Sequence, residues 1–136
     1  MTLLWDYLHG LGRNEMQAWA KKEKLGVRER AQLNQKLDML AQIGFDTACH
    51  LEFLAGTSGE FNQVYKLVVK SQRMLRPMLC RGPIDPKGEV TLLCGAIEKD
   101  FKLVPPAAAE QAERNRRQVI GADAAGITKR IDHERF

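Results

Sequence analysis

The sequence has little cysteine, no long hydrophobic run and no start typical of a secretory signal. Its three cysteines are an odd number without a Cys-x-x-Cys pair, which argues against a disulfide framework and against a thiolate zinc site. No apolar segment approaches the roughly 20 residues that a membrane-spanning helix needs. The first residues carry an acid and a histidine but no basic region, unlike a signal peptide. We therefore expect a cytoplasmic protein without a membrane anchor.

The motifs of common cofactor and metal enzymes are missing as well. There is no glycine-rich phosphate loop and no Gly-x-Ser-x-Gly elbow. The histidines, His9, His50 and His133, lie far apart in the sequence and lack a metal-ligand spacing. We expect neither a metal ion nor a cofactor. Cys80 and Cys94 fall in expected strands and are interpreted as small core residues.

Apolar residues are plentiful enough for one packed domain. They make up 44% of the 136 residues, which is too much for a disordered chain, and the length leaves no room for a second core. We expect a single domain over residues 1–136. Residues 121–136 show no periodicity and are expected as a flexible tail or as a segment lying across the sheet. A role for His133 in catalysis or merely at the surface is left open.

Positive charge is concentrated in the middle of the chain. The net charge is +4, and residues 66–102 contain eight Lys/Arg against four Asp/Glu, whereas the segments before and after are nearly neutral. No acid occurs over residues 61–84. A local basic surface is typical of proteins that bind a polyanion such as RNA. The alternative is ordinary solvated surface charge.

The hydrophobic pattern predicts an α+β fold. Helical spacing predicts two N-terminal helices, one after Asn14 as N-cap and one over residues 31–41 that ends near Gly44. The second half alternates in polarity, which predicts antiparallel strands, and the prolines at 105–106 begin a C-terminal helix. We therefore expect a small antiparallel sheet packed against two N-terminal helices, with a C-terminal helix and tail. The strands are expected over residues 64–70, 74–81 and 89–97, and the apolar residues 3–8 are left open between a strand and a helical turn.

The basic side chains fall on these strands. Alternation places Lys66 and Lys70 on the face opposite the apolar side chains. Arg76 and Arg81 have opposite parity in an unbroken strand, so a bulge, expected near Pro77, is needed to bring them to one face. Such a face would hold a phosphate, since the planar guanidinium fork binds two phosphate oxygens at once.

A charged pair ends the last expected strand. Glu98 next to cations is placed to act as a base, and Lys99 to stabilise developing negative charge. The same pair is also compatible with an ordinary solvated strand end. Gly95, within this strand, is expected to allow the close approach of another backbone.

Short motifs run along nearly the whole chain. They include TyrLysLeuVal, LeuArgPro, LeuCysArgGlyPro, a strand ending in GluLys, and a helix begun by proline that carries AlaGluArgAsnArgArg. Together they resemble the RelE/HigB toxin superfamily, specifically its phage-derived, uncharacterised members. These motifs stand at residues 65–68, 75–77, 79–83, 89–99 and 112–117, and residues 5–15, 33–41 and 133–135 are similar to one sub-branch.

The resemblance implies a RelE-like fold and a toxin of a toxin–antitoxin system. Such a toxin cleaves messenger RNA without a metal ion, in many members on the ribosome. In the family chemistry the ribose 2′-hydroxyl attacks the neighbouring phosphate while basic side chains neutralise the transition state. The implied partners are RNA and an antitoxin protein. Whether Trp5 and Tyr7 belong to the core or to an interface of a homo-oligomer is left open.

The resemblance also implies site residues by position. Arg76 matches the arginine of the family's Tyr-Arg step, Lys99 matches one of two family lysines, and Glu98 departs from the other. Lys66 and Val68 stand in the family's Glu-Leu-Arg step, so only Lys66 carries a charge there. The Val68 departure keeps a second hypothesis open, an inactive RelE-fold module that binds a protein or RNA partner. The expected catalytic residues are Arg76, Lys66, Glu98 and Lys99, and the expected RNA phosphate-binding residues are Lys70, Arg73, Arg81 and Lys102.

Overall fold

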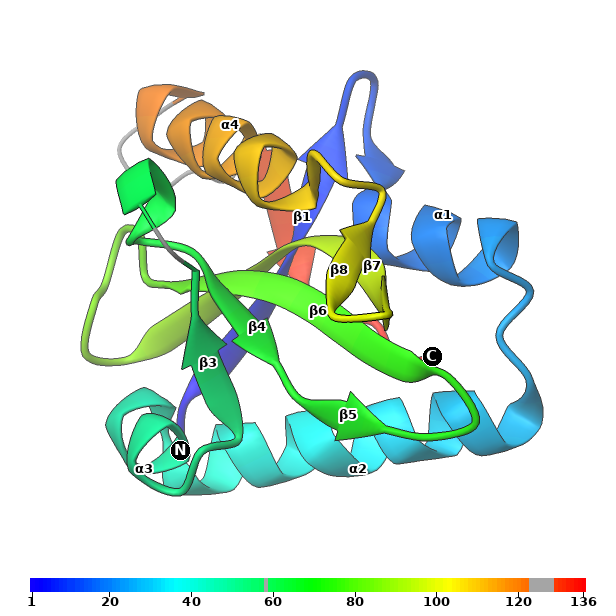
Figure 1. The fold of residues 1–136 in the computed structure, drawn as a ribbon. Coiled ribbons are helices and arrows are strands. Elements are labelled where there is room, and N and C mark those ends of the chain that lie inside the picture. Colours follow the sequence, from blue (N-terminus) through cyan, green and yellow to red (C-terminus); the bar gives the residue numbers. More distant parts are fainter. Residues whose placement is uncertain (58, 123–128) are drawn as a thin grey trace.

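The computed structural model describes residues 1–57, 59–122 and 129–136. These residues form an open, twisted sheet with the strand order β2-β1-β7-β6-β4-β3, with α1, α2 and α3 on one face and α4 on the other (Figure 1). The elements are β1 (Leu3–His9), β2 (Arg13–Asn14), α1 (Glu15–Lys22), α2 (Val27–Ile43), α3 (Phe45–His50), β3 (Leu54–Gly56), a 3-10 turn η1 (Gly59–Phe61), β4 (Tyr65–Leu67), β5 (Val69–Lys70), β6 (Met74–Arg81), β7 (Glu89–Lys99), β8 (Lys102–Val104), α4 (Ala108–Ala122) and β9 (Arg130–Asp132). The α+β prediction is confirmed.

Helices form at both expected N-terminal positions. Helix α1 begins after Asn14 and α2 ends before Gly44, as expected, but α2 begins at Val27 rather than near residue 31. Asn14 caps α1, because its side-chain oxygen accepts a hydrogen bond from the Gln17 amide at 3.1 Å. The second helix, α2, ends at Gly44, whose φ of +84° suits a residue without a side chain. A short further helix, α3, was not expected.

The first strand corrects the expectation of a small, purely antiparallel sheet. The open segment at residues 3–8 is the strand β1, which runs parallel to β7 from the pair Leu3 and Glu89 to the pair Asp6 and Leu92. Strand β7 is apolar on both faces and needs a neighbour on each edge. Strand β6 supplies the antiparallel neighbour through a hairpin, and β1 the parallel one, with the helices α1 to α3 crossing one face between them.

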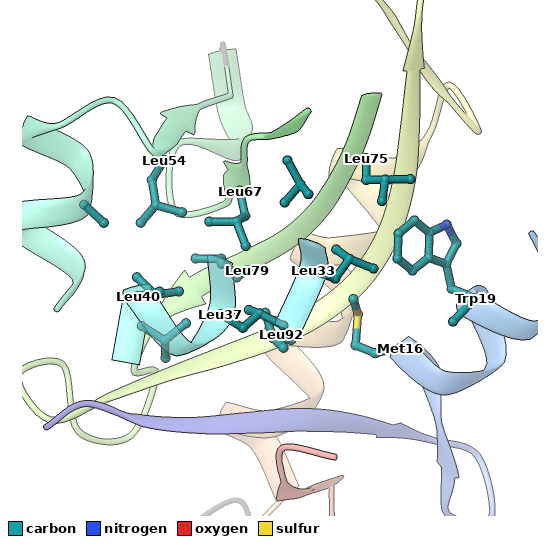
Figure 2. Packing of buried hydrophobic residues seen from close by; sticks show 14 of the residues in the cluster. Met16, Trp19, Leu33, Leu37, Leu40, Leu54, Leu67, Leu75, Leu79 and Leu92 are labelled. Carbon is teal, nitrogen blue, oxygen red and sulfur yellow. The ribbon is translucent and has the colours of Figure 1, made fainter. Parts of the chain in front are cut away.

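The main core lies between the sheet and α1 to α3. Figure 2 shows Leu33 and Leu37 of α2 close to Leu79 and Leu92 of the central strands, with Trp19 of α1 beside them. A second cluster lies between the other face and α4, formed by Val64, Met78, Cys80, Leu93, Cys94 and Ala112. Both strand cysteines are buried, so their interpretation as core residues is confirmed.

Two details of the central strands differ from expectation. The bulge is not in β6 near Pro77 but in β7, where Leu93 is an extra residue between the pairs Met78–Cys94 and Leu79–Leu92. The group that approaches Gly95 closely is the side chain of Trp19 rather than another backbone, because a Cβ atom at Gly95 would lie 1.9 Å from the Trp19 ring.

The segment expected as a tail, residues 121–136, belongs to more than one structural element. Residues 121 and 122 end α4, residues 123–128 lie outside the described part, and β9 pairs antiparallel with β1. Beyond β9, the Gln17 side chain donates to the carbonyls of Glu134 and Arg135, and Asn34 exchanges two hydrogen bonds with the Phe136 backbone. The C-terminal segment is therefore held against α1 and α2. Within the described ranges, no helix is both long and apolar enough to cross a membrane.

Candidate functional site

Lys66, Arg76 and Glu98 meet on the α4 side of the sheet. They come from three strands, β4, β6 and β7. Lys66 Nζ lies 3.5 Å from Glu98 Oε1, and Arg76 Nη2 lies 3.2 Å from Glu98 Oε2. The carboxylate therefore bridges two cations, and the three side chains carry a net charge of about +1 at neutral pH. We refer to Lys66, Arg76 and Glu98 as the cationic triad.

The bulge in β7 is what brings Glu98 to Arg76. At the turn end of the hairpin Cys80 pairs with Thr91, and an unbroken register would then place Arg76 opposite Gly95. The extra residue in β7 shifts the pairing by one, so Arg76 lies opposite Ala96 instead. Because side chains alternate along a strand, this shift places Glu98, rather than Lys99, on the face of Arg76.

The cationic triad combines a buried cation with groups that solvent can reach. Arg76 is 5% exposed and also donates through Nη1 to the Leu75 carbonyl at 3.0 Å. The side chains of Lys66 and Glu98 are 24% and 21% exposed. Burial raises the pKa of Glu98, but the charges and hydrogen bonds of Arg76 and Lys66 outweigh it, so the pKa is lowered. Glu98 is thus a carboxylate at neutral pH, and its lowered pKa makes it a weaker base than an unpaired glutamate.

Lys99 and Lys102 lie beside the triad rather than in it. They face each other across the end of the β7–β8 hairpin, and both are exposed. Lys99 extends from the side of β7 opposite Glu98. Both Glu98 and Lys99 nevertheless line a surface depression of about 410 Å³, which residues 72–74 border on its other side.

The structure separates Arg73 from the triad. Arg73 donates two hydrogen bonds to Glu29 of α2, at 3.0 and 2.8 Å, and a further one to the Glu23 carbonyl at 3.0 Å. The side-chain hydrogen bond from Arg73 lowers the pKa of Glu29 despite the opposing effect of burial. This arginine joins the strands to the helices and is largely neutralised.

Arg81 does not share a face with Arg76, so the expected phosphate-binding surface formed by both is wrong. The bulge that was expected to unite them lies in β7 instead of β6, so the alternation along β6 is kept. Arg81 is ion-paired with Asp46 of α3, and its guanidinium lies 4.6 Å from the centre of the Phe45 ring.

Lys70 is also separated from Lys66. The strand expected over residues 64–70 is broken at Val68, whose amide donates to the Phe53 carbonyl at 2.8 Å. Val68 and Lys70 line a different depression together with Lys36 and Phe53. The Val68 departure from the RelE/HigB pattern therefore lies outside the cationic triad.

Two buried polar clusters, around Asp6 and around Glu89, were not predicted from the sequence. Asp6, fully buried, contacts His133 Nδ1 at 2.8 Å and accepts from the Asn14 side chain at 3.0 Å, which gives His133 a structural partner. Glu89 binds the guanidinium of Arg130 from β9. The partners are separated by 127 and 41 residues, and no local pattern in the sequence links them.

Comparisons with known proteins leave the family open. No protein-family model, no curated protein and no solved structure matches this chain.

Proposed function

We propose that this chain is a RelE-like, metal-independent ribonuclease, the toxin of a toxin–antitoxin system, with the cationic triad as its active site. The observation that carries the proposal is the convergence of Lys66, Arg76 and Glu98. The sequence resemblance placed all three positions in the family site, although only Arg76 keeps the residue type of the family. The proposal is supported at the coarse level by the α+β class of the structure, in which α1 and α2 lie on one sheet face.

The triad offers each group that RNA transesterification requires. Glu98 accepts the proton of the ribose 2′-hydroxyl as the O2′–P bond forms and the P–O5′ bond breaks. The products are a 2′,3′-cyclic phosphate and a 5′-hydroxyl, whose oxygen takes the proton back from Glu98. Lys66 and Arg76 neutralise the charge that develops on the phosphate oxygens.

The burial of Arg76 suits this role. Its guanidinium is held by the Leu75 carbonyl and by Glu98, so it is ordered before substrate arrives. A cation fixed in a partly water-excluded site stabilises developing charge more strongly than a mobile surface lysine. Lys99 and Lys102, being exposed, are better suited to hold flanking phosphates.

The test is cleavage of synthetic RNA by purified protein, with and without ribosomes and in the presence of a chelator. Wild type should form 2′,3′-cyclic phosphate ends, and Glu98→Gln should lower the rate by about 100-fold or more. Arg28→Ala, a change at an exposed arginine of α2 on the other sheet face, is the matched control and should cleave like wild type. A folded wild-type protein that cleaves RNA under neither condition contradicts the proposal.

A second candidate is an inactive RelE-fold module that binds RNA or a protein partner. It is favoured by the two ion pairs that already satisfy Glu98, because a base engaged in this way must release a partner to take up a proton. RNA binding by wild type without cleavage, with or without ribosomes, would select it.

Both candidate functions, the ribonuclease toxin and the inactive binding module, are compatible with a protein partner. An antitoxin would cover the face that carries the triad. Of Trp5 and Tyr7, only the half-buried Trp5 remains available to a homo-oligomer interface. Tyr7 is 3% exposed, and the Trp5 ring lies 4.3 Å from the Arg130 guanidinium within the same chain.

A further inference from the structure

The tip of the β7–β8 hairpin carries an unusual exposed phenylalanine. Asp100 and Phe101 form a two-residue loop between the paired residues Lys99 and Lys102. The φ angles of Asp100 and Phe101 are +52° and +64°, and Phe101 is 99% exposed. Figure 1 draws this hairpin, β7 and β8, in yellow-green and yellow.

The stability of the fold does not account for this tip. A two-residue hairpin loop with two positive φ angles is a type I′ turn, which favours Asn-Gly or Asp-Gly. Phe101 occupies the glycine position, where a bulky side chain strains the backbone. Lys99 and Lys102 stand directly opposite each other, and like charges in this arrangement destabilise a hairpin. Two unfavourable features thus coincide with an exposed aromatic ring within four residues.

The tip lies next to the cationic triad. Glu98 precedes Phe101 by three residues, so their Cα atoms are at most about 10 Å apart. Glu98, Lys99 and Asp100 line the same depression of about 410 Å³. Glu98 is the one triad residue that lines this depression, so a nucleotide chain bound at Glu98 would come within reach of the tip.

We propose that Phe101 is a stacking platform for the base of a single-stranded RNA nucleotide next to the cleaved bond, with Lys99 and Lys102 binding the flanking phosphates. This inference rests on the proposed ribonuclease function and extends it to substrate recognition. An exposed aromatic ring between lysines is how proteins bind single strands without reading their sequence. The neighbours of the ring are charged and exposed, which favours RNA over an apolar protein surface.

The first arm of the test measures binding of a short 2′-O-methyl RNA, which cannot be cleaved. Phe101→Ala should weaken binding by about 5-fold to 100-fold, whereas Phe101→Trp should bind at least as tightly as wild type. The matched control is Leu11→Ala, a fully exposed apolar residue in the β1–β2 turn, and it should leave the affinity unchanged. Melting temperatures check that each variant is folded.

The second arm replaces single bases of the RNA by abasic sites. One abasic position should weaken wild-type binding by the same factor as Phe101→Ala, and the two changes together should weaken it no further. Equal RNA affinity of wild type and Phe101→Ala overturns the inference while the proposed function stands. In that case, loss of a co-purified protein from Phe101→Ala would assign the tip to a protein contact. A wild type that binds no RNA, alone or with ribosomes, overturns both proposals.

Discussion

The guanidinium of Arg76, 5% exposed, donates to Glu98 Oε2 at 3.2 Å, so a carboxylate that solvent still reaches holds a buried cation in place. Lys66 binds the other oxygen of the same carboxylate. This relationship links stability and proposed chemistry, because the three groups that pair with one another in the free protein are the groups that would contact RNA in the proposed function.

Arg76→Ala is expected to abolish cleavage and to destabilise the fold moderately. The change removes the closest cation of Glu98 and one hydrogen bond to the backbone, and we expect a loss of about 2 kcal/mol in the free energy of unfolding. Urea unfolding measures this loss, and cleavage is compared at a temperature where the variant is fully folded. Arg76→Lys keeps the charge but not the planar fork, and should be intermediate in rate. A folded Arg76→Ala protein with wild-type cleavage would remove Arg76 from the active site.

The contribution of Glu98 to stability should be lost in acid. Because its pKa in the folded protein is lowered, its contribution is fully present above the ordinary glutamate pKa and disappears as the pH falls through the folded value. The difference in unfolding free energy between wild type and Glu98→Gln should therefore be largest at neutral pH and shrink as the pH falls below the ordinary glutamate pKa. Glu134→Gln, at an exposed carboxylate, should show no such trend. A difference that grew towards low pH would contradict the ion pairing of Glu98.

Arg73→Ala should lower the stability of the fold and leave RNA cleavage nearly unchanged. It leaves Glu29, whose side chain is 7% exposed, without its main partner, and we expect a loss of about 2–3 kcal/mol in stability. Since Arg73 lies in the joint between strands and helices, the rate of RNA cleavage by the folded variant should stay within about 3-fold of wild type. Parallel unfolding and cleavage assays test both statements, and a stable variant that lost RNA cleavage would restore Arg73 to the phosphate-binding set.

Gly95→Ala should disrupt the contact between β7 and α1. The new methyl group would lie 1.9 Å from Trp19 Cδ2, so the indole ring must move out of the main core. Overpacking of this kind costs about 3 kcal/mol. A thermal melt together with tryptophan fluorescence would detect it, and an unchanged melting temperature and spectrum would contradict the packing of Trp19 on Gly95.

Phe101→Gly should raise stability while weakening RNA binding. Glycine adopts the positive φ of this turn position without strain, so a gain of about 1 kcal/mol is expected. Stability gained at the cost of function is typical of a functional site. A variant that was less stable than wild type would mean that the ring makes a contact needed by the fold.

Helices α1 and α2 were predictable because their signals are local. Asn14 at the start of α1 and Gly44 at the end of α2 act through the backbone within a few residues. Strand β1 was not predictable in the same way, because its partner β7 lies more than 80 residues further along the chain. The pairing of distant strands depends on the whole sheet rather than on the pattern of one segment.

The candidate site was predictable only in part, for a similar reason. Lys66, Arg76 and Glu98 were recognised as candidates by residue type and position, but the face of Glu98 depends on the bulge at Leu93, which alternation alone does not reveal. Arg73 and Arg81 were predicted to bind phosphate. Their acidic partners, Glu29 and Asp46, come from helices far away in the sequence, so the ion pairs could not be recognised from neighbouring residues. The absence of acids over residues 61–84 of the sequence therefore does not mean that these arginines lack acidic partners in the fold.

The most direct test of the central claim is induced expression in a bacterial host, with growth and messenger RNA ends recorded for wild type, Arg76→Ala and Arg28→Ala. We expect growth arrest and new 2′,3′-cyclic phosphate ends in messenger RNA for wild type and Arg28→Ala, and neither effect for Arg76→Ala. Normal growth and intact messenger RNA with soluble, folded wild-type protein would contradict the central claim.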